Sequence, residues 1–292
     1  MKKITLAYFG SPDFSAKFLE KLLIDISIKR LIEVKLVITQ PDRPVGRKQI
    51  LTPTPVKQVA LKYGLKVLEI GNFLGKLDQL EIRNLDLCLI YFYGQIIPKD
   101  ILLLPKYGFW NIHFSLLPKY RGPAPAVWSL INGDTKTGVS LVQTDEKLDH
   151  GDLIAQKEVG INPQETKIAL EERLDNISYD LFKKEAKNLL DGKINLTPQN
   201  HELSTYAGFP TKQDGYIEIS NFKFQISNSP KKLFNLFRGL YPWPGIWTIL
   251  PNGKRLKITN MELGKIKRVQ LEGKTEVDFE TFNKAYKVFG NS

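Results

Sequence analysis

The first half of the chain alternates apolar, β-rich runs with segments whose apolar residues recur at helical spacing. Such alternation is typical of a largely parallel sheet covered by helices, because parallel strands need a crossover between them. A helix is predicted to begin at Ser11-Pro12, with Ser11 as its cap, and two more over 55–63 and 166–190. Strands are predicted over residues 4–9, 34–39, 65–68, 86–92, 109–113, 137–144 and 153–159, the last two paired with each other.

The pattern of apolar and polar residues in the sequence changes after residue 192. Residues 193–206 are polar and lose periodicity, which indicates a linker. Residues 207–292 contain short apolar runs separated by Gly, Asn and Pro, a pattern that suggests a small β-barrel or sandwich. We therefore expect an α/β domain over 1–192, a linker over 193–206 and a β domain over 207–292. The strand candidates in the β domain are 216–219, 246–250, 255–259 and 268–271.

Positive charge is concentrated in the β domain. The 292-residue chain has a net charge of +11, and residues 207–292 hold 14 Lys and Arg against 7 Asp and Glu. The basic residues of the β domain form either a solvated face or a binding surface for phosphates. The excess of positive charge favours a polyanionic partner. The single cysteine excludes an internal disulfide framework and a Cys-rich zinc site.

No segment predicts a membrane anchor or a secretion signal. The apolar run at 4–9 is too short for a signal peptide, and the longest uncharged stretch, 239–253, contains three prolines. We expect a soluble, cytoplasmic protein without membrane contact.

Asn111 and His113 are the first candidates for chemistry. Residues two apart on a strand face the same side, and this strand is predicted to end at His113, where parallel sheets place their sites. The segment 115–125 that follows is rich in Pro and Gly, which predicts a rigid, shaped loop. The alternative is a half-buried histidine with an ordinary role at a strand end.

Asp149 is the second candidate. It stands in Leu148-Asp149-His150-Gly151-Asp152 between two predicted strands, where a hairpin turn is the simpler interpretation. The functional interpretation is a carboxylate that orients His113 or takes a proton. His150 and His201 receive no role, and the scattered histidines show no metal-ligand spacing, so no metal is predicted.

The segment 40–48 is the third candidate. It is basic, stiffened by prolines and long for a connection, so it is either a solvated loop or an arm that folds onto an anionic ligand. Gly10 after the first strand stands alone, without the Gly-x-Gly-x-x-Gly pattern, and a nicotinamide enzyme is rejected on that ground.

Together these residues resemble the folate-dependent formyltransferases, along nearly the whole chain. The segment 39–47, the run Thr54-Pro55-Val56-Lys57 and the segment 238–245 resemble the branch of the family that acts on tRNA. Phe114 and His150 depart from the family pattern. The motifs that carry the resemblance are Asn111-x-His113-x-Ser115-Leu116-Leu117-Pro118, Arg121-Gly122-x-Ala124-Pro125, Leu148-Asp149-x-Gly151-Asp152, the run 9–14 and the run 93–98.

The resemblance implies a Rossmann-like first domain and an OB-like β-barrel as the second. It implies the transfer of a formyl group from 10-formyltetrahydrofolate to the α-amino group of methionine on initiator tRNA, leaving tetrahydrofolate. We expect the protein to be a monomer. Asn111 and His113 would stabilise the oxyanion, and Asp149 would help to remove the amine proton, although whether His113 or Asp149 carries it stays open. The folate would contact Tyr93, Gly94, Ser115, Leu116, Leu117 and Pro118. The tRNA would contact Arg43, Arg47, Lys48, Lys231, Lys232, Arg238, Lys254 and Arg255.

Two alternatives remain at this point. A formyltransferase that acts on a nucleotide-linked amino sugar would share Asn111, His113 and Asp149, but the basic segment 40–48 and the charge of the β domain favour RNA. The second alternative is a nucleic-acid-binding protein with a degenerate enzyme fold, and the intact Asn–His–Asp set argues against it.

Overall fold

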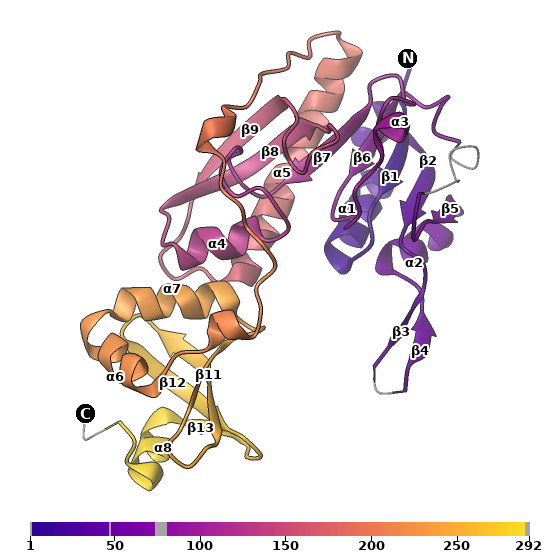
Figure 1. Ribbon diagram of the computed structural model, residues 1–292. Helices are drawn as coiled ribbons and strands as arrows, with labels where there is room; N and C mark the ends of the chain where they lie inside the picture. Colours follow the sequence, from indigo (N-terminus) through magenta and orange to yellow (C-terminus); the bar gives the residue numbers. More distant parts are fainter. Residues whose placement is uncertain (1, 47, 74–80, 290–292) are drawn as a thin grey trace. The chain divides into compact units, whose positions relative to one another are not determined.

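A computed structural model describes residues 2–46, 48–73 and 81–289, and the chain divides into two compact units. The N-terminal unit contains residues 1–121, 138–158 and 174–205. The C-terminal unit contains residues 206–292 together with two earlier segments of the chain, 122–137 and 159–173. Each unit has its own sheet (Figure 1).

The N-terminal unit is built on a seven-stranded sheet with the order β5-β2-β1-β6-β7-β8-β9. The pairs β5–β2, β2–β1, β1–β6 and β6–β7 are parallel and β7–β8 is antiparallel, which confirms the predicted largely parallel, Rossmann-like sheet. As predicted, β8 and β9 are neighbours. The strand bounds are β1 Ile4–Phe9, β2 Ile32–Thr39, β5 Lys66–Glu69, β6 Leu87–Ile90, β7 Phe109–His113, β8 Lys136–Gln143 and β9 Leu153–Gly160.

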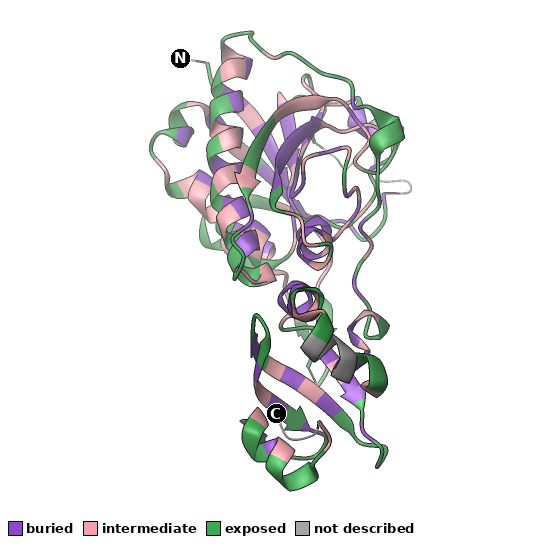
Figure 2. Cartoon of the chain, turned by 90° about the vertical axis from the view of Figure 1, so that its left-hand side faces the viewer, coloured by how far each residue is buried: buried purple, intermediate pink, exposed green. Residues whose placement is uncertain are grey.

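Strands in the middle of this sheet are buried, as their purple colour in Figure 2 shows. They carry apolar side chains on both faces, so helices cover the sheet. On one face Phe18 of α1 packs on Tyr8 of β1 and on Phe182 of α5, and Trp110 of β7 meets Phe182 as well. The opposite face forms a second cluster with Phe109 of β7. The helix bounds are α1 Asp13–Ile24, α2 Pro55–Lys62, α3 Lys99–Leu102 and α5 Lys167–Leu190, and a 3-10 turn spans Ile28–Arg30.

Two local predictions in this unit were wrong. The first helix begins one residue later than predicted, and Ser11 does not cap it, because the Ser11 hydroxyl instead accepts the backbone N–H of Gln40 at 3.3 Å. The segment 40–48 is not an irregular loop throughout, since β3 (Arg43–Val45) pairs antiparallel with β4 (Ile50–Thr52).

The C-terminal unit holds a four-stranded antiparallel sheet, β10 Ile246–Ile249, β11 Arg255–Glu262, β12 Lys265–Leu271 and β13 Glu276–Asp278. This confirms a small β domain at this end of the chain. Three helices, α6 Ile219–Asn228, α7 Pro230–Leu240 and α8 Phe279–Tyr286, were not predicted. The strand predicted over 216–219 was wrong, because Tyr216 makes only an isolated bridge to Trp247 and α6 begins at Ile219.

Helix α4 (Pro125–Ile131) belongs to the core of the C-terminal unit. Ala124 and Val127 pack there with Leu233 and Phe237 of α7, and Gly239 of α7 lets the two helices approach closely. Two 3-10 turns, His201–Leu203 and Gln213–Gly215, lie in the part of the chain between α5 and α6. Within the described residues, no helix has the length and apolarity needed to span a membrane.

Candidate active site

Asn111, His113 and Asp149 lie together at the end of β7. The Asn111 amide nitrogen Nδ2 donates to Asp149 Oδ1 at 3.0 Å, and His113 Nδ1 lies 3.6 Å from Asp149 Oδ2. The side chains of His113 and Asp149 are each 6% exposed. The alternation of the strand puts Asn111 and His113 on one face, and the hairpin after β8 brings the carboxylate to them.

The ring of His113 is oriented by the backbone. Its Nε2 lies 2.8 Å from the carbonyl oxygen of Tyr120. A carbonyl oxygen can only accept, so Nε2 carries a proton and Nδ1 is the nitrogen that faces the carboxylate. The 3.6 Å between Nδ1 and Asp149 is ion-pair range but longer than a hydrogen bond.

The loop that carries Asp149 is held by close backbone packing. Asp149 adopts a left-handed conformation with φ 48°, which aspartate tolerates better than most residues. At Gly151, an added Cβ would lie 1.8 Å from the carbonyl oxygen of Gln143 and 3.2 Å from the backbone nitrogen of Asp145. Only glycine permits this approach, so the loop has little freedom to move Asp149.

The predicted folate residues 115–118 form a loop tied to the adjacent strands. The Ser115 hydroxyl donates to the carbonyl of Lys119 at 2.6 Å, so this side chain serves the loop itself. Ser140 of β8 and Gln156 of β9 hold the backbone of Leu117, through bonds of 3.1 and 2.9 Å. Ser140 and Gln156 were missed by the sequence analysis, because neither stands in a motif that marks it.

Tyr93 and Gly94, also predicted for folate, follow β6 at the neighbouring strand end. Tyr93 is buried, and its burial raises the pKa of the phenol, which therefore stays protonated and donates to the carbonyl of Ile70 at 3.2 Å. The Tyr93 carbonyl accepts from the Gln40 side chain at 2.8 Å. The two segments predicted for folate thus follow the carboxyl ends of adjacent strands, β6 and β7, where open α/β sheets bind ligands.

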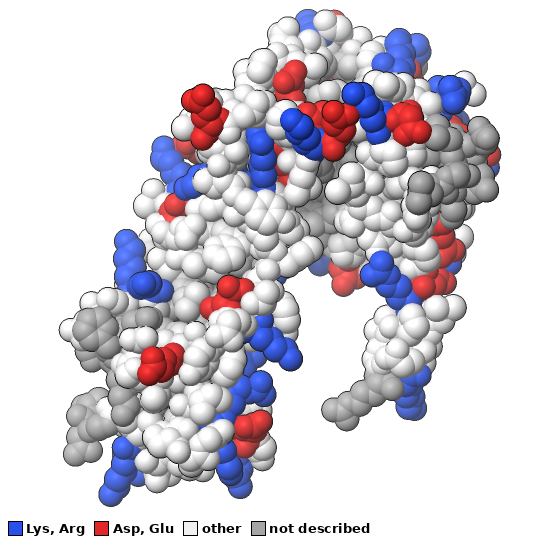
Figure 3. Space-filling model, viewed as in Figure 1, with Lys and Arg blue, Asp and Glu red and all other residues white. Residues whose placement is uncertain are grey.

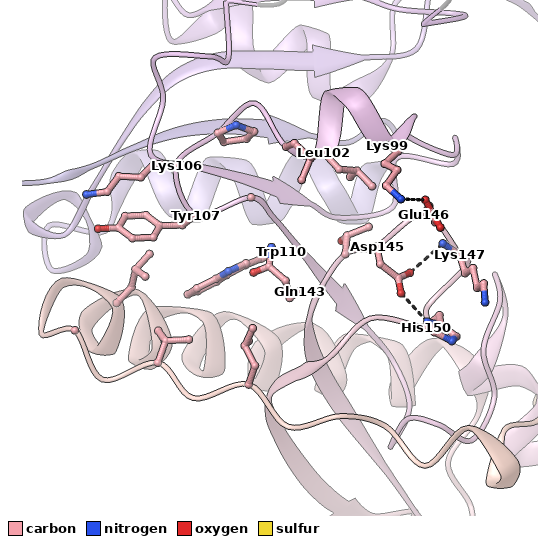
Figure 4. Close-up of a pocket in the computed structure, with 18 residues that line it drawn as sticks. Lys99, Leu102, Lys106, Tyr107, Trp110, Gln143, Asp145, Glu146, Lys147 and His150 are labelled. Atoms are coloured by element: carbon pink, nitrogen blue, oxygen red, sulfur yellow. Dashed lines mark hydrogen bonds and ion pairs between the residues drawn. The ribbon is translucent and has the colours of Figure 1, made fainter.

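A cavity of about 890 Å³ lies beside the Asp149 loop (Figure 4). Trp110 and Tyr107 line it, whereas Asn111, next along the strand, faces Asp149. Lys99 and Glu146 form an ion pair at its edge, with 3.0 Å between Nζ and Oε2. None of the six residues predicted for folate is among the described residues that line this cavity.

The exposed residues predicted for tRNA lie on the β3–β4 hairpin, at the start of α7 and at the start of β11. Arg43 and Lys48 are exposed on the β3–β4 hairpin, and Arg47 lies outside the described residues. Lys231 and Lys232 are exposed in the first turn of α7. Lys254 and Arg255 are exposed where β11 begins. Figure 3 shows basic side chains on the C-terminal unit and near the tip of the hairpin.

Arg238 is buried, unlike the other described residues predicted for tRNA. It is 4% exposed, and its Nε donates to the Asn235 side-chain oxygen at 3.0 Å. Its Nη1 donates to the carbonyls of Asn162 and Glu165 at 3.2 and 3.4 Å. Burial lowers the pKa of its guanidinium. The prediction of a phosphate contact for Arg238 is corrected, because its donors face the interior of the unit.

The two departures from the family motif have local explanations. Phe114 is 3% exposed and meets Phe92 edge to face, with ring centroids 5.2 Å apart. His150 stacks on His201 at 3.8 Å, and its Nδ1 lies 2.6 Å from Asp145 Oδ2. Desolvation, with smaller contributions from the charges of His150 and Arg121, lowers the pKa of His201.

A doubly wound sheet with an amide, an imidazole and a carboxylate at the end of one strand is an arrangement suited to acyl-transfer enzymes. The sequence matches the family described as Formyl transferase over residues 2–184, and the C-terminal domain of Formyl transferase over 217–268. The chain belongs to the formyltransferase family.

Relatives span both parts of the chain. The methionyl-tRNA formyltransferase of Caldicellulosiruptor saccharolyticus is 39% identical over 270 residues, which cover 91% of this chain and 82% of that protein. Among solved structures, a 4-N formyltransferase from Francisella tularensis superposes with a TM-score of 0.68 at 20% identity, covering 90% of this chain and 99% of that one. An N-formyltransferase from Helicobacter canadensis, in complex with folinic acid and dTDP-3-aminofucose, has a TM-score of 0.61 at 22% identity, over 92% and 93%. Both structures share the fold of this chain.

Proposed function

We propose that this enzyme transfers the formyl group of 10-formyltetrahydrofolate to the α-amino group of methionine on initiator tRNA. The observation that carries the proposal is the convergence of Asn111, His113 and Asp149 at the carboxyl end of β7. The choice of acceptor rests on relatives named methionyl-tRNA formyltransferase, 35–39% identical over most of the chain, and on the exposed basic residues of the C-terminal unit.

The geometry suits the tetrahedral intermediate of this reaction. The neutral amine attacks the formyl carbon, and the formyl oxygen gains negative charge. The Asn111 amide has two hydrogens, of which one bonds Asp149, so the second can meet this oxygen. His113 already uses Nε2 to bond the Tyr120 carbonyl, so it would supply the second donor through a protonated Nδ1. Each donor aimed at a developing oxyanion contributes about 3 kcal/mol of transition-state stabilisation.

Asp149 lies beside both donors and is also a candidate to accept the proton that must leave the amine. Its Oδ1 accepts from Asn111 and its Oδ2 lies 3.6 Å from His113 Nδ1, so the one carboxylate is placed to orient both donors. The amine loses a proton and N10 of the folate gains one as the carbon–nitrogen bond breaks, which yields formylmethionyl-tRNA and tetrahydrofolate. His113 and Asp149 are both placed to relay this proton, directly or through one water.

The donor would bind where the segments 115–118 and 93–94 follow β7 and β6. The many internal hydrogen bonds of these segments leave the shape of the pocket largely independent of the ligand, which favours a preformed folate site.

The proposal is tested by comparing acceptors at a fixed concentration of 10-formyltetrahydrofolate. We expect kcat/KM for methionyl-initiator-tRNA to exceed that for a nucleotide-linked amino sugar by orders of magnitude, because only the tRNA can use the basic surfaces. Mass spectrometry of the products measures both reactions. A preference for the sugar would identify the protein as a sugar formyltransferase. Binding of RNA without formyl transfer to either acceptor would identify it as an RNA-binding protein without this activity.

The exposed basic residues of the C-terminal unit predict a salt dependence of tRNA binding. If Lys231, Lys232, Lys254 and Arg255 each contact one phosphate, their joint replacement by Ser lowers the slope of log Kd against log salt by about 3, since each contact releases slightly less than one counterion. Titration of labelled tRNA between 50 and 200 mM salt, concentrations over which such contacts weaken strongly, measures the slope.

The matched control removes four lysines from another surface. Lys183, Lys184, Lys187 and Lys193 belong to the N-terminal unit, along and just after α5. Their replacement by Ser removes the same charge and is expected to leave the slope nearly unchanged. Equal slopes for both quadruple variants would place the RNA surface elsewhere.

A further inference from the structure

Residues 199–205, which sequence analysis assigned to the linker, contact both loops of the proposed active site. Gln199 lies against the loop of Asp149, and Thr205 lies against the segment that bonds His113. All of these residues belong to the N-terminal unit. The inference below deepens the proposed function and rests on it.

Gln199 is a buried amide, and both hydrogen bonds that its nitrogen donates go to the Asp149 loop. It is 5% exposed, and its Nε2 donates to the carbonyls of Asp149 at 3.0 Å and Gly151 at 2.7 Å. Its Oε1 accepts from Arg121 Nη2 at 2.7 Å. Because Arg121 can only donate, it fixes which end of the amide faces the loop. The two donors of one side chain thus hold the backbone on both sides of His150.

The stacked pair of His150 and His201 provides a second contact between the connecting segment and the Asp149 loop. Arg121 Nη2 also lies 2.8 Å from His201 Nδ1, which must therefore be the acceptor. The His201 ring stacks on His150 with an interplanar angle of 8°, and His150 bonds Asp145 at the start of the loop. The guanidinium of Arg121 is thus shared by the two residues, Gln199 and His201, that touch the loop from the connecting segment.

Thr205 acts on the other catalytic side chain. Its Oγ1 accepts the Tyr120 N–H at 2.8 Å, and its carbonyl accepts the Arg121 N–H at 2.8 Å. The Tyr120 carbonyl in turn accepts from His113 Nε2. The orientation of that carbonyl, and with it the orientation of the imidazole, depends on how the segment 120–121 is held.

We propose that Gln199 and Thr205 are positioning residues, which hold Asp149 and His113 at the separation that formyl transfer requires. The segment 199–205 is then part of the support of the active site as well as a connection between units. Neither side chain needs to touch a substrate. Displacement of a catalytic group by about 1 Å costs on the order of a hundredfold in rate, so loss of these bonds is expected to act on kcat.

The first test replaces Gln199 with Met, which keeps the volume and removes the hydrogen bonds. We expect kcat for formyl transfer to methionyl-tRNA to fall by about ten- to a hundredfold, with KM for both substrates and Kd for tRNA within about threefold. The control is Gln270→Met, the same replacement at an exposed glutamine of β12 whose side chain donates to the Lys274 carbonyl, away from the segment 199–205 and from the loop of Asp149. Its kcat is expected to stay at the wild-type value.

The second test separates the hydrogen bond of Thr205 from its packing. Thr205→Val keeps the shape but loses the acceptor, and is expected to lower kcat about tenfold with KM unchanged. Thr205→Ser keeps the acceptor and is expected to restore wild-type kcat. Because Thr205 is exposed, these variants are expected to fold even if Gln199→Met does not.

The outcomes distinguish this inference from the function on which it rests. Wild-type kcat in both Gln199→Met and Thr205→Val, or a change in KM alone, would reduce the segment to a connection and overturn the inference. Equal losses in Thr205→Val and Thr205→Ser would do the same for Thr205. If the wild-type protein itself fails to formylate methionyl-tRNA, the proposed function fails first.

Discussion

Asn111→Ala and His113→Ala are each expected to lower kcat for formyl transfer by about two to three orders of magnitude. Each change removes one donor from the position where the formyl oxygen becomes an oxyanion, and it also leaves Asp149 without a partner that it now has at 3.0 or 3.6 Å. The affinity for tRNA is expected to stay the same, because neither side chain is one of the basic residues predicted to contact tRNA. Single-turnover kinetics with saturating folate, together with a separate tRNA titration, measure the two quantities.

The control for these variants lies on the same strand. Ile112 is buried between the two residues and points to the other face of the sheet, so Ile112→Val tests the effect of disturbing β7 without touching the donors. It is expected to cost about 1 kcal/mol of stability and to leave kcat near wild type. Full activity in either alanine variant would remove that residue from the mechanism.

Gly151→Ala is expected to have the second large effect. The new Cβ would lie 1.8 Å from the Gln143 carbonyl oxygen and 3.0 Å from its carbon, and both are backbone atoms of β8 that cannot rotate away. The loop must shift, and Asp149, two residues earlier, shifts with it. We expect a loss of at least about 1–3 kcal/mol of stability and about a hundredfold or more in kcat, measured by thermal unfolding and by the transfer assay.

Gly160→Ala provides the comparison. Gly160 is at the end of β9, and the nearest atom to its added Cβ, the carbonyl oxygen of Thr135, is 3.9 Å away, an ordinary contact. This variant is expected to resemble the wild type in both assays. If Gly151→Ala also kept wild-type kcat, the tight approach of the loop to β8 would have no part in placing Asp149.

Much of the N-terminal unit follows from local pattern. The strand 109–113 was predicted at its observed bounds, and the helix predicted over 166–190 differs by one residue. In buried strands and long amphipathic helices, the spacing of apolar residues along the sequence shows the type of element, so a single sequence suffices to find them. The helix α7 had the same kind of signal, with Pro230 at its first position and Leu233, Phe234 and Phe237 at helical spacing, but the short runs around it were interpreted as strands.

The tRNA surface shows where residue type alone misleads. Lys231 and Arg238 both stand on α7, yet Lys231 is exposed and Arg238 is buried against the carbonyls of Asn162 and Glu165. The difference depends on which face of the helix meets a segment that lies far away in the sequence. A basic residue on an amphipathic helix can lie on either face, and the net charge of the domain does not distinguish them.

The sequence by itself determined the largely parallel sheet, the pairing of Asn111 with His113 on one strand face, and the excess of positive charge near the C-terminus. These are properties of neighbouring residues or of composition. Only the tertiary structure decided that Asp149 reaches both donors, that Arg238 is internal, and that Gln199 lies against the Asp149 loop. The physical reason is that these contacts join residues about 40 to 80 positions apart, and the folding of the sheet and its connections brings them together.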